Sequence, residues 1–116
     1  MDMVSNTGES LLDPVKVGLL GLGTVGGGTV NLLERNRDEI TRRAGRPIDV
    51  VHAAASHPDR PRTCSTENIK LEYDAYAVVD DPSTEIIIEL IGGVDLAKEL
   101  TLRAIDNGKH VVTANK

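Results

Sequence analysis

The stretch VKVGLLGLGTVG at residues 15–26 decides the fold, because a short apolar run leads directly into the spacing G-x-G-x-x-G. The apolar run predicts a buried strand, and the pattern that follows predicts a helix. In this setting Gly21 allows a sharp turn, Gly23 lets a phosphate approach the backbone, and Gly26 lets the helix pack on the strand. The stretch therefore predicts a dinucleotide-binding turn. The alternative is an ordinary tight turn that holds no ligand.

Strand-like and helix-like segments alternate along the rest of the chain. Residues 1–14 predict a flexible tail, and residues 15–116 predict one domain. Within it we expect strands at 15–20, 48–55, 85–90 and 110–113, helices at 24–44, 73–79 and 95–107, and a polar loop at 56–70. Alternating strands and helices form right-handed crossovers. The pattern therefore predicts an α/β fold with a Rossmann-like, doubly wound parallel sheet.

Ligands of doubly wound sheets bind beyond the carboxyl ends of the strands. In the predicted order, three segments meet at that edge: residues 21–26, 91–94 and 113–116. The loop at 56–62 lies beside them. We therefore expect the functional residues to come from these four segments.

Composition limits the classes of partner. The chain has 116 residues and a formal net charge of -5, which argues against binding to nucleic acid or to a membrane surface. It has no run of about 18 apolar residues that would span a membrane. Its first 14 residues lack the basic start and apolar centre of a signal peptide, so we expect a cytoplasmic protein. The single cysteine, Cys64, predicts a free thiol in a loop and no multi-cysteine metal site.

The residues after the second predicted strand bear on the choice of cofactor. Enzymes that prefer NAD usually place a carboxylate there to bind the ribose 2′-hydroxyl, whereas arginines attract the 2′-phosphate of NADP. Here the position holds Ser56 or His57, Asp59 lies later, and Arg60 and Arg62 follow. The sequence therefore favours NADP, with NAD as the other possibility. The alternative is that the two arginines are solvated loop charges.

Three further positions lie near the expected cofactor edge. Glu89 ends the third predicted strand, where it could be catalytic or could hydrogen-bond nearby backbone. Gly92 and Gly93 would let the backbone lie against a nicotinamide ribose. Lys116 could contact a cofactor phosphate, a carboxamide oxygen or a substrate carboxylate, or could be a surface lysine. Reduction of a carbonyl requires a proton donor to the developing alkoxide, and Lys116 alone is too little to assign that role.

Four stretches together resemble the amino-terminal part of homoserine dehydrogenases: VGLLGLGTVG at 17–26, RAGRPI at 43–48, ELIGG at 89–93 and NGKHVVTANK at 107–116. The resemblance covers residues 15–116, and the last stretch is far more specific than the glycine turn. It implies an NAD(P)-dependent interconversion of L-homoserine and L-aspartate 4-semialdehyde, on the route to threonine, isoleucine and methionine. The residues that it places along the cofactor are Leu22, Thr24, Val25 and Gly26 at the pyrophosphate, Gly92 and Gly93 near the nicotinamide, and Lys116 facing the substrate pocket.

The chain departs from this family's pattern in three respects. Members often have an arginine where this chain has Ser56, so Arg60 or Arg62 would have to replace it. The glycine turn also continues as Gly27-Gly28, where a larger residue is common. In addition, the family's substrate-binding and dimerisation region follows the Asn-Lys motif with which this chain ends.

This last departure predicts a truncated nucleotide-binding domain that binds dinucleotide weakly and does not turn over. The small amino-acid substrate and any homo-oligomer would then belong to the full-length enzyme. One alternative is a stand-alone NAD(P)-binding regulatory module. Another is an oxidoreductase related to glucose–fructose oxidoreductase, but that group typically has Glu-Lys-Pro where this chain has Ala114-Asn115-Lys116.

Overall fold

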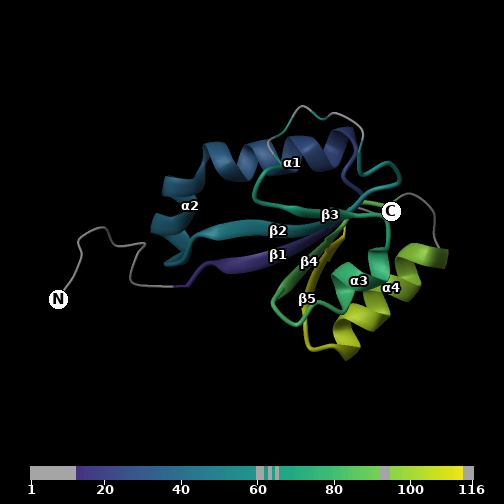
Figure 1. The fold of residues 1–116 in the computed structure, drawn as a ribbon. Coiled ribbons are helices and arrows are strands. Elements are labelled where there is room, and N and C mark those ends of the chain that lie inside the picture. Colours follow the sequence, from purple (N-terminus) through teal and green to yellow (C-terminus); the bar gives the residue numbers. More distant parts are fainter. Residues whose placement is uncertain (1–12, 60–61, 63, 65, 92–94, 114–116) are drawn as a thin grey trace.

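A single parallel sheet organises the chain (Figure 1). The computed structural model describes residues 13–59, 62, 64, 66–91 and 95–113. The strands are β1 (Val15–Leu20), β2 (Ile48–Ala54), β3 (Lys70–Glu72), β4 (Ile86–Glu89) and β5 (His110–Thr113). Their order is β3-β2-β1-β4-β5, and each pair of neighbours is parallel. This order confirms the doubly wound, Rossmann-like sheet, and it reverses between β1 and β4.

Helices cover both faces of the sheet. Helices α1 (Thr24–Arg35) and α2 (Arg37–Ala44) lie over one face, and α3 (Ala75–Val79) and α4 (Asp95–Asp106) lie over the other (Figure 1). Neighbouring residues of β1 serve opposite faces, because side chains alternate along a strand. Leu19 packs in a cluster with Val30 of α1, whereas Leu20 packs with Val78 of α3 and Leu100 of α4. Aliphatic residues thus fill both cores.

The predicted helix at 24–44 is wrong at one point, because Asn36 divides it into α1 and α2. Asn36 has φ -103° and ψ 19°, and its side-chain Nδ2 donates to the Leu32 carbonyl at 3.0 Å. Asparagine side chains compete with the helical hydrogen-bond ladder in this way. The break lets α2 turn so that Arg37 forms an ion pair with Asp49 of β2.

The strands predicted at 48–55 and 85–90 and the helix predicted at 95–107 are shorter by one or two residues in the structure, and two larger differences concern β3 and α3. The segment expected to be a loop as far as residue 70 ends in β3, which pairs with β2 through Lys70, Leu71 and Glu72. Three residues are too few to show the alternation by which a strand is recognised. Helix α3 begins at residue 75 rather than 73, because the Asp74 carboxylate caps it by accepting a hydrogen bond from the Tyr76 N–H at 2.9 Å.

Most of the predicted flexible tail, residues 1–12, lies outside the described residues. Its last two residues are held against the domain, because the side chain of Arg46 donates to the carbonyls of Asp13 at 2.9 Å and Pro14 at 3.4 Å. Among the described helices, none has both the length and the apolar content needed to cross a membrane.

Two neighbouring carboxylates after α3 have lowered pKa values. Hydrogen bonds from Arg103 and then Asn107 lower the pKa of Asp80 from 3.8 to about 2. Burial alone would raise the pKa of Asp81, but hydrogen bonds from Ser83 and from the buried His52 outweigh it and lower the value to about 2. Both groups therefore bind protons more weakly in the folded chain than in the unfolded chain.

We expect the free energy of unfolding to fall as the pH is lowered from about 4 to about 2. The stabilisation from a depressed pKa is present above the unfolded-state value and is lost as pH falls through the folded-state value. Urea unfolding across this range should show a shallower pH dependence for Asp81→Asn than for the unchanged chain. Asp38→Asn, at an exposed position on α2, is the charge-matched control. Equal slopes for Asp81→Asn and the unchanged chain would contradict the assignment.

Candidate dinucleotide-binding site

The glycine-rich turn lies at the carboxyl edge of the sheet, where the strand order reverses. Gly21 follows β1 with φ +98°, and its N–H donates to the Ala54 carbonyl at the end of β2 at 2.9 Å. A Cβ on Gly21 would lie 3.2 Å from the backbone of Leu90, just beyond β4. The left-handed conformation and this close backbone approach both require glycine. The turn therefore sits between the ends of β1, β2 and β4.

The third glycine of the motif lets α1 begin against the turn. A Cβ on Gly26 would lie 2.5 Å from the carbonyl oxygen of Gly21, which is closer than a real Cβ approaches. The first turn of α1 and the end of β1 can therefore approach each other only because residue 26 has no side chain. This contact fixes where the amino terminus of α1 points.

The middle glycine faces open space at the start of α1. Among the described residues, none apart from its chain neighbours and its own helix backbone has an atom within 4 Å of a Cβ built on Gly23, and no described side chain caps the helix there. The first helical bond runs from the Gly27 N–H to the Gly23 carbonyl at 2.8 Å, so the N–H groups of residues 24–26 have no acceptor within the helix. The first turn also carries no acidic residue. This arrangement suits an anion such as a pyrophosphate.

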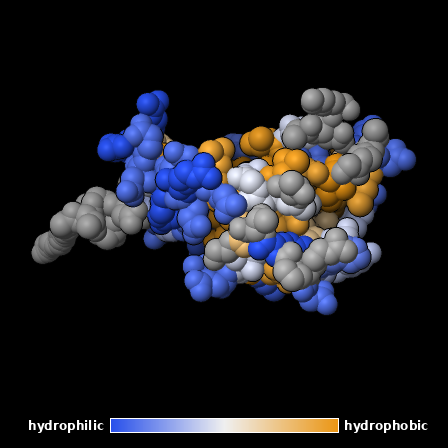
Figure 2. Space-filling view, turned by 90° about the horizontal axis from the view of Figure 1, so that it is seen from above, coloured by the Kyte–Doolittle hydropathy of each residue, from blue (hydrophilic) through white to orange (hydrophobic). Residues whose placement is uncertain are grey.

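The surface of the chain is less polar at the end where α1 begins than at the end where α2 lies. Figure 2 shows hydrophilic colour gathered over α2 and hydrophobic colour toward the end at which α1 begins. Val25 and Leu32 of α1 are 67% and 54% exposed. Val25 therefore leaves apolar surface two residues from the open Gly23, whereas Leu32 lies nine residues from it along α1.

Arg62 connects the loop after β2 to the glycine-rich turn. Its Nε donates to the Leu22 carbonyl at 3.1 Å, and its Nη2 and Nη1 donate to the carbonyls of His57 at 2.8 Å and Pro58 at 3.3 Å. The guanidinium is therefore not a solvated loop charge, because it bonds backbone carbonyls of two segments. The sequence did not indicate this role, because the Leu22 contact spans 40 residues and has no local spacing signal.

Glu89 is buried at the carboxyl end of β4, with only 1% of its surface exposed. Its Oε2 accepts a hydrogen bond from the Ile91 N–H at 2.7 Å, and its Oε1 accepts one from the Thr113 hydroxyl at 2.7 Å. The sequence left open a catalytic role and a role in hydrogen-bonding nearby backbone. The observed contacts fit the second role. Glu89 thereby joins the end of β4 to the end of β5.

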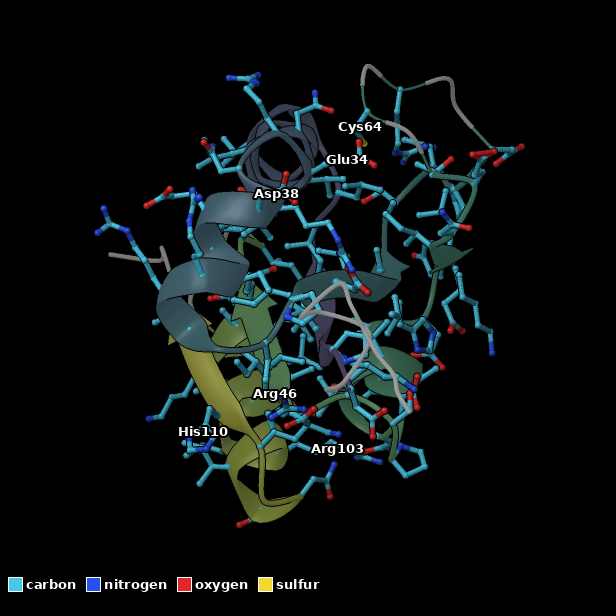
Figure 3. All side chains as sticks on the ribbon, turned by 90° about the vertical axis from the view of Figure 1, so that its left-hand side faces the viewer. Glu34, Asp38, Arg46, Cys64, Arg103 and His110 are labelled. Carbon is cyan, nitrogen blue, oxygen red and sulfur yellow. The ribbon has the colours of Figure 1, made fainter. Side chains whose placement is uncertain are left out.

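Ser56 is exposed and lies two residues beyond the end of β2. Arg60, Gly92, Gly93 and Lys116 lie outside the described residues. Cys64 is a buried free thiol that packs with Leu22, and Figure 3 shows it on the α1 side of the sheet. Within the described ranges, no three His, Cys, Asp or Glu side chains are grouped so that they could hold a metal ion.

Known proteins have sequences similar to this chain. The family model described as the NAD binding domain of homoserine dehydrogenase matches residues 21–116. The chain is 56% identical over 105 residues to a homoserine dehydrogenase of Pseudomonas aeruginosa, covering 90% of this chain and 24% of the relative. It is 53% identical over 105 residues to that of Methylobacillus glycogenes, covering 90% of this chain and 26% of the relative. The chain thus spans about a quarter of the length of the curated relatives it matches.

A solved structure agrees with the sequence comparisons. The crystal structure of a homoserine dehydrogenase from Thiobacillus denitrificans superposes with a TM-score of 0.81 at 56% identity, covering 88% of this chain and 23% of that chain. The matched family model, the glycine-rich turn at the strand-order reversal and this superposition all agree. The chain therefore belongs to the homoserine dehydrogenase family, as its NAD-binding domain.

Proposed function

We propose that this chain is the dinucleotide-binding part of a homoserine dehydrogenase. The complete enzyme would interconvert L-homoserine and L-aspartate 4-semialdehyde with a nicotinamide dinucleotide. The observation that carries the proposal is the open Gly23 at the uncapped start of α1, next to the strand-order reversal. Family membership supplies the reaction and the substrate class.

The pyrophosphate would lie against the glycine-rich turn. Gly21, Leu22 and Gly23 would form its floor, and the backbone N–H groups of Thr24, Val25 and Gly26 would point toward the phosphate oxygens. Further along the cofactor, Ser56 and Arg60 would lie near the adenosine ribose. Gly92, Gly93 and Lys116 would lie near the nicotinamide. When bound, the nicotinamide supplies or accepts the hydride, and these residues bind and orient it.

We assign no acid–base residue to this chain. The protonation of the developing alkoxide, the binding of the small amino-acid substrate and any homo-oligomer are proposed for the complete enzyme. A location in the cytoplasm follows from the same proposal, because the reaction belongs to amino-acid biosynthesis. We propose no role in binding nucleic acid or membranes.

We further propose that NADP is preferred to NAD. The residues that follow β2 are Ala55, Ser56 and His57, so none of them is a carboxylate that would repel a 2′-phosphate. Arg60 adds a positive charge to the same loop. Arg62 does not support this preference, because its side chain bonds backbone carbonyls. The preference therefore rests on Arg60 together with the absence of a carboxylate at residues 55–57.

Calorimetric titration of the chain with NADPH, NADP, NADH and NAD tests both proposals. We expect binding of all four, tighter for the phosphorylated pair, and an Arg60→Gln chain should lose affinity for that pair alone. Gly23→Ala should weaken all four by at least about tenfold, because its methyl group would occupy space that the pyrophosphate needs. Its thermal unfolding should stay unchanged, since none of the described residues that surround the turn has an atom within 4 Å of the new Cβ. A chain that binds none of the four would contradict the proposed function.

A further inference from the structure

The peptide group between Leu22 and Gly23 is held on both sides. Its carbonyl oxygen accepts the hydrogen bond from Arg62 Nε at 3.1 Å, and its N–H donates to the Gly21 carbonyl at 3.0 Å. A trans peptide is rigid and its oxygen and hydrogen point in opposite directions, so two such bonds fix the orientation of its plane. This plane leads directly into the open Gly23 and the start of α1.

The same guanidinium also fixes the segment after β2. Two of its remaining donors bond the carbonyls of His57 and Pro58, which come directly after the exposed Ser56. Arginine suits this position because its planar group presents five donors in a fixed arrangement, so one side chain serves carbonyls in different directions. Arg62 thus joins the turn after β1 to the loop after β2.

We propose that Arg62 is a positioning residue that holds the glycine-rich turn and the segment after β2 in register, so that they bind the dinucleotide as one unit. The proposal rests on the dinucleotide-binding function proposed above. It gives Arg62 a role in the affinity for every dinucleotide, and no role in the choice between NADP and NAD. An arginine that contacted the 2′-phosphate would instead affect the choice between NADP and NAD, because it would raise the affinity for NADP alone.

Two substitutions separate these roles. In the 116-residue chain, Arg62→Gln should weaken NADPH and NADH by the same factor, about tenfold, as expected for the loss of roughly one net charge-assisted hydrogen bond. The ratio of the two affinities should not change. Arg62→Lys keeps the charge but not the planar arrangement of donors, so it should restore only part of the lost affinity. Arg42→Gln removes the same charge from an exposed position on α2 and should bind as the unchanged chain does.

Amide hydrogen exchange provides a readout that does not depend on cofactor. We expect faster exchange at the Gly23 and Gly27 amides in Arg62→Gln than in Arg42→Gln, because both amides donate to carbonyls within the turn that Arg62 holds. Circular dichroism tests whether each variant is folded. If Arg62→Gln is not folded, the exchange comparison is made with Arg62→Lys instead. Loss of affinity confined to NADPH, unchanged affinity or unchanged exchange would each overturn the proposal. If the unchanged chain binds neither dinucleotide, the proposed function fails, and the exchange comparison still decides whether Arg62 holds the turn.

Discussion

Gly26→Ala should destabilise the chain by about 1–3 kcal/mol and weaken dinucleotide binding by more than about tenfold. The new Cβ would lie 2.5 Å from the carbonyl oxygen of Gly21 and 3.3 Å from its carbonyl carbon. Both are backbone atoms, so no side-chain rotation relieves the overlap. Either α1 moves away from the turn or the turn distorts, and each response changes the position of the N–H groups at the start of the helix.

Gly28→Ala is a matched control in the same helix. In the part of the chain that the structure describes, no residue outside the helix backbone and the chain neighbours of Gly28 lies within 4 Å of a Cβ built there, so the methyl group meets no described obstacle. Alanine is favoured over glycine inside a helix by about 1 kcal/mol, so this variant should be more stable than the unchanged chain. Urea unfolding followed by circular dichroism measures both effects. If Gly26→Ala proved as stable as Gly28→Ala, the close contact with Gly21 would not exist in solution.

Glu89→Ala should destabilise the chain by about 2–4 kcal/mol. The substitution removes the acceptor of the Ile91 N–H and of a Thr113 hydroxyl hydrogen bond, at a position that is 1% exposed. It also leaves a cavity between the ends of β4 and β5. Because Gly92 and Gly93 directly follow Ile91 in the sequence, we expect the loss of these hydrogen bonds to disturb the nicotinamide end of the proposed site as well.

Glu89→Gln tests whether hydrogen bonding or charge matters at this position. Its amide oxygen can still accept from the Ile91 N–H, and its amide nitrogen can donate to the Thr113 oxygen. We therefore expect a change within about 1 kcal/mol, measured by the same urea unfolding. A loss as large as that of Glu89→Ala would show that the negative charge itself is required. A negligible loss for Glu89→Ala would show that the two hydrogen bonds add little to stability.

The sequence was most informative where the physical cause is local. The motif glycines predicted the turn, because the positive φ at Gly21 and the close backbone contact at Gly26 both favour a residue without a side chain. The first and last predicted strands, at 15–20 and 110–113, have the same bounds as β1 and β5. Alternation of strands and helices was sufficient to predict the doubly wound sheet, because parallel strands need crossovers of one hand.

Prediction was weaker where competing local signals had similar strength. The division of the predicted helix at Asn36 depends on one side chain that competes with the helical ladder, and such residues also occur within unbroken helices. β3 has three residues, and it is a strand only because β2 offers it a free edge. Neither feature has a periodic pattern long enough to recognise.

The sequence by itself determined the fold class, the turn and the family, because these depend on residue size, spacing and pattern along the chain. Only the tertiary structure decided what Arg62 and Glu89 contact. The hydrogen bonds of Arg62 to Leu22 and of Glu89 to Thr113 join residues 40 and 24 positions apart. A charged side chain in a sequence does not specify its partner, since that partner is set by which strand ends the sheet brings together.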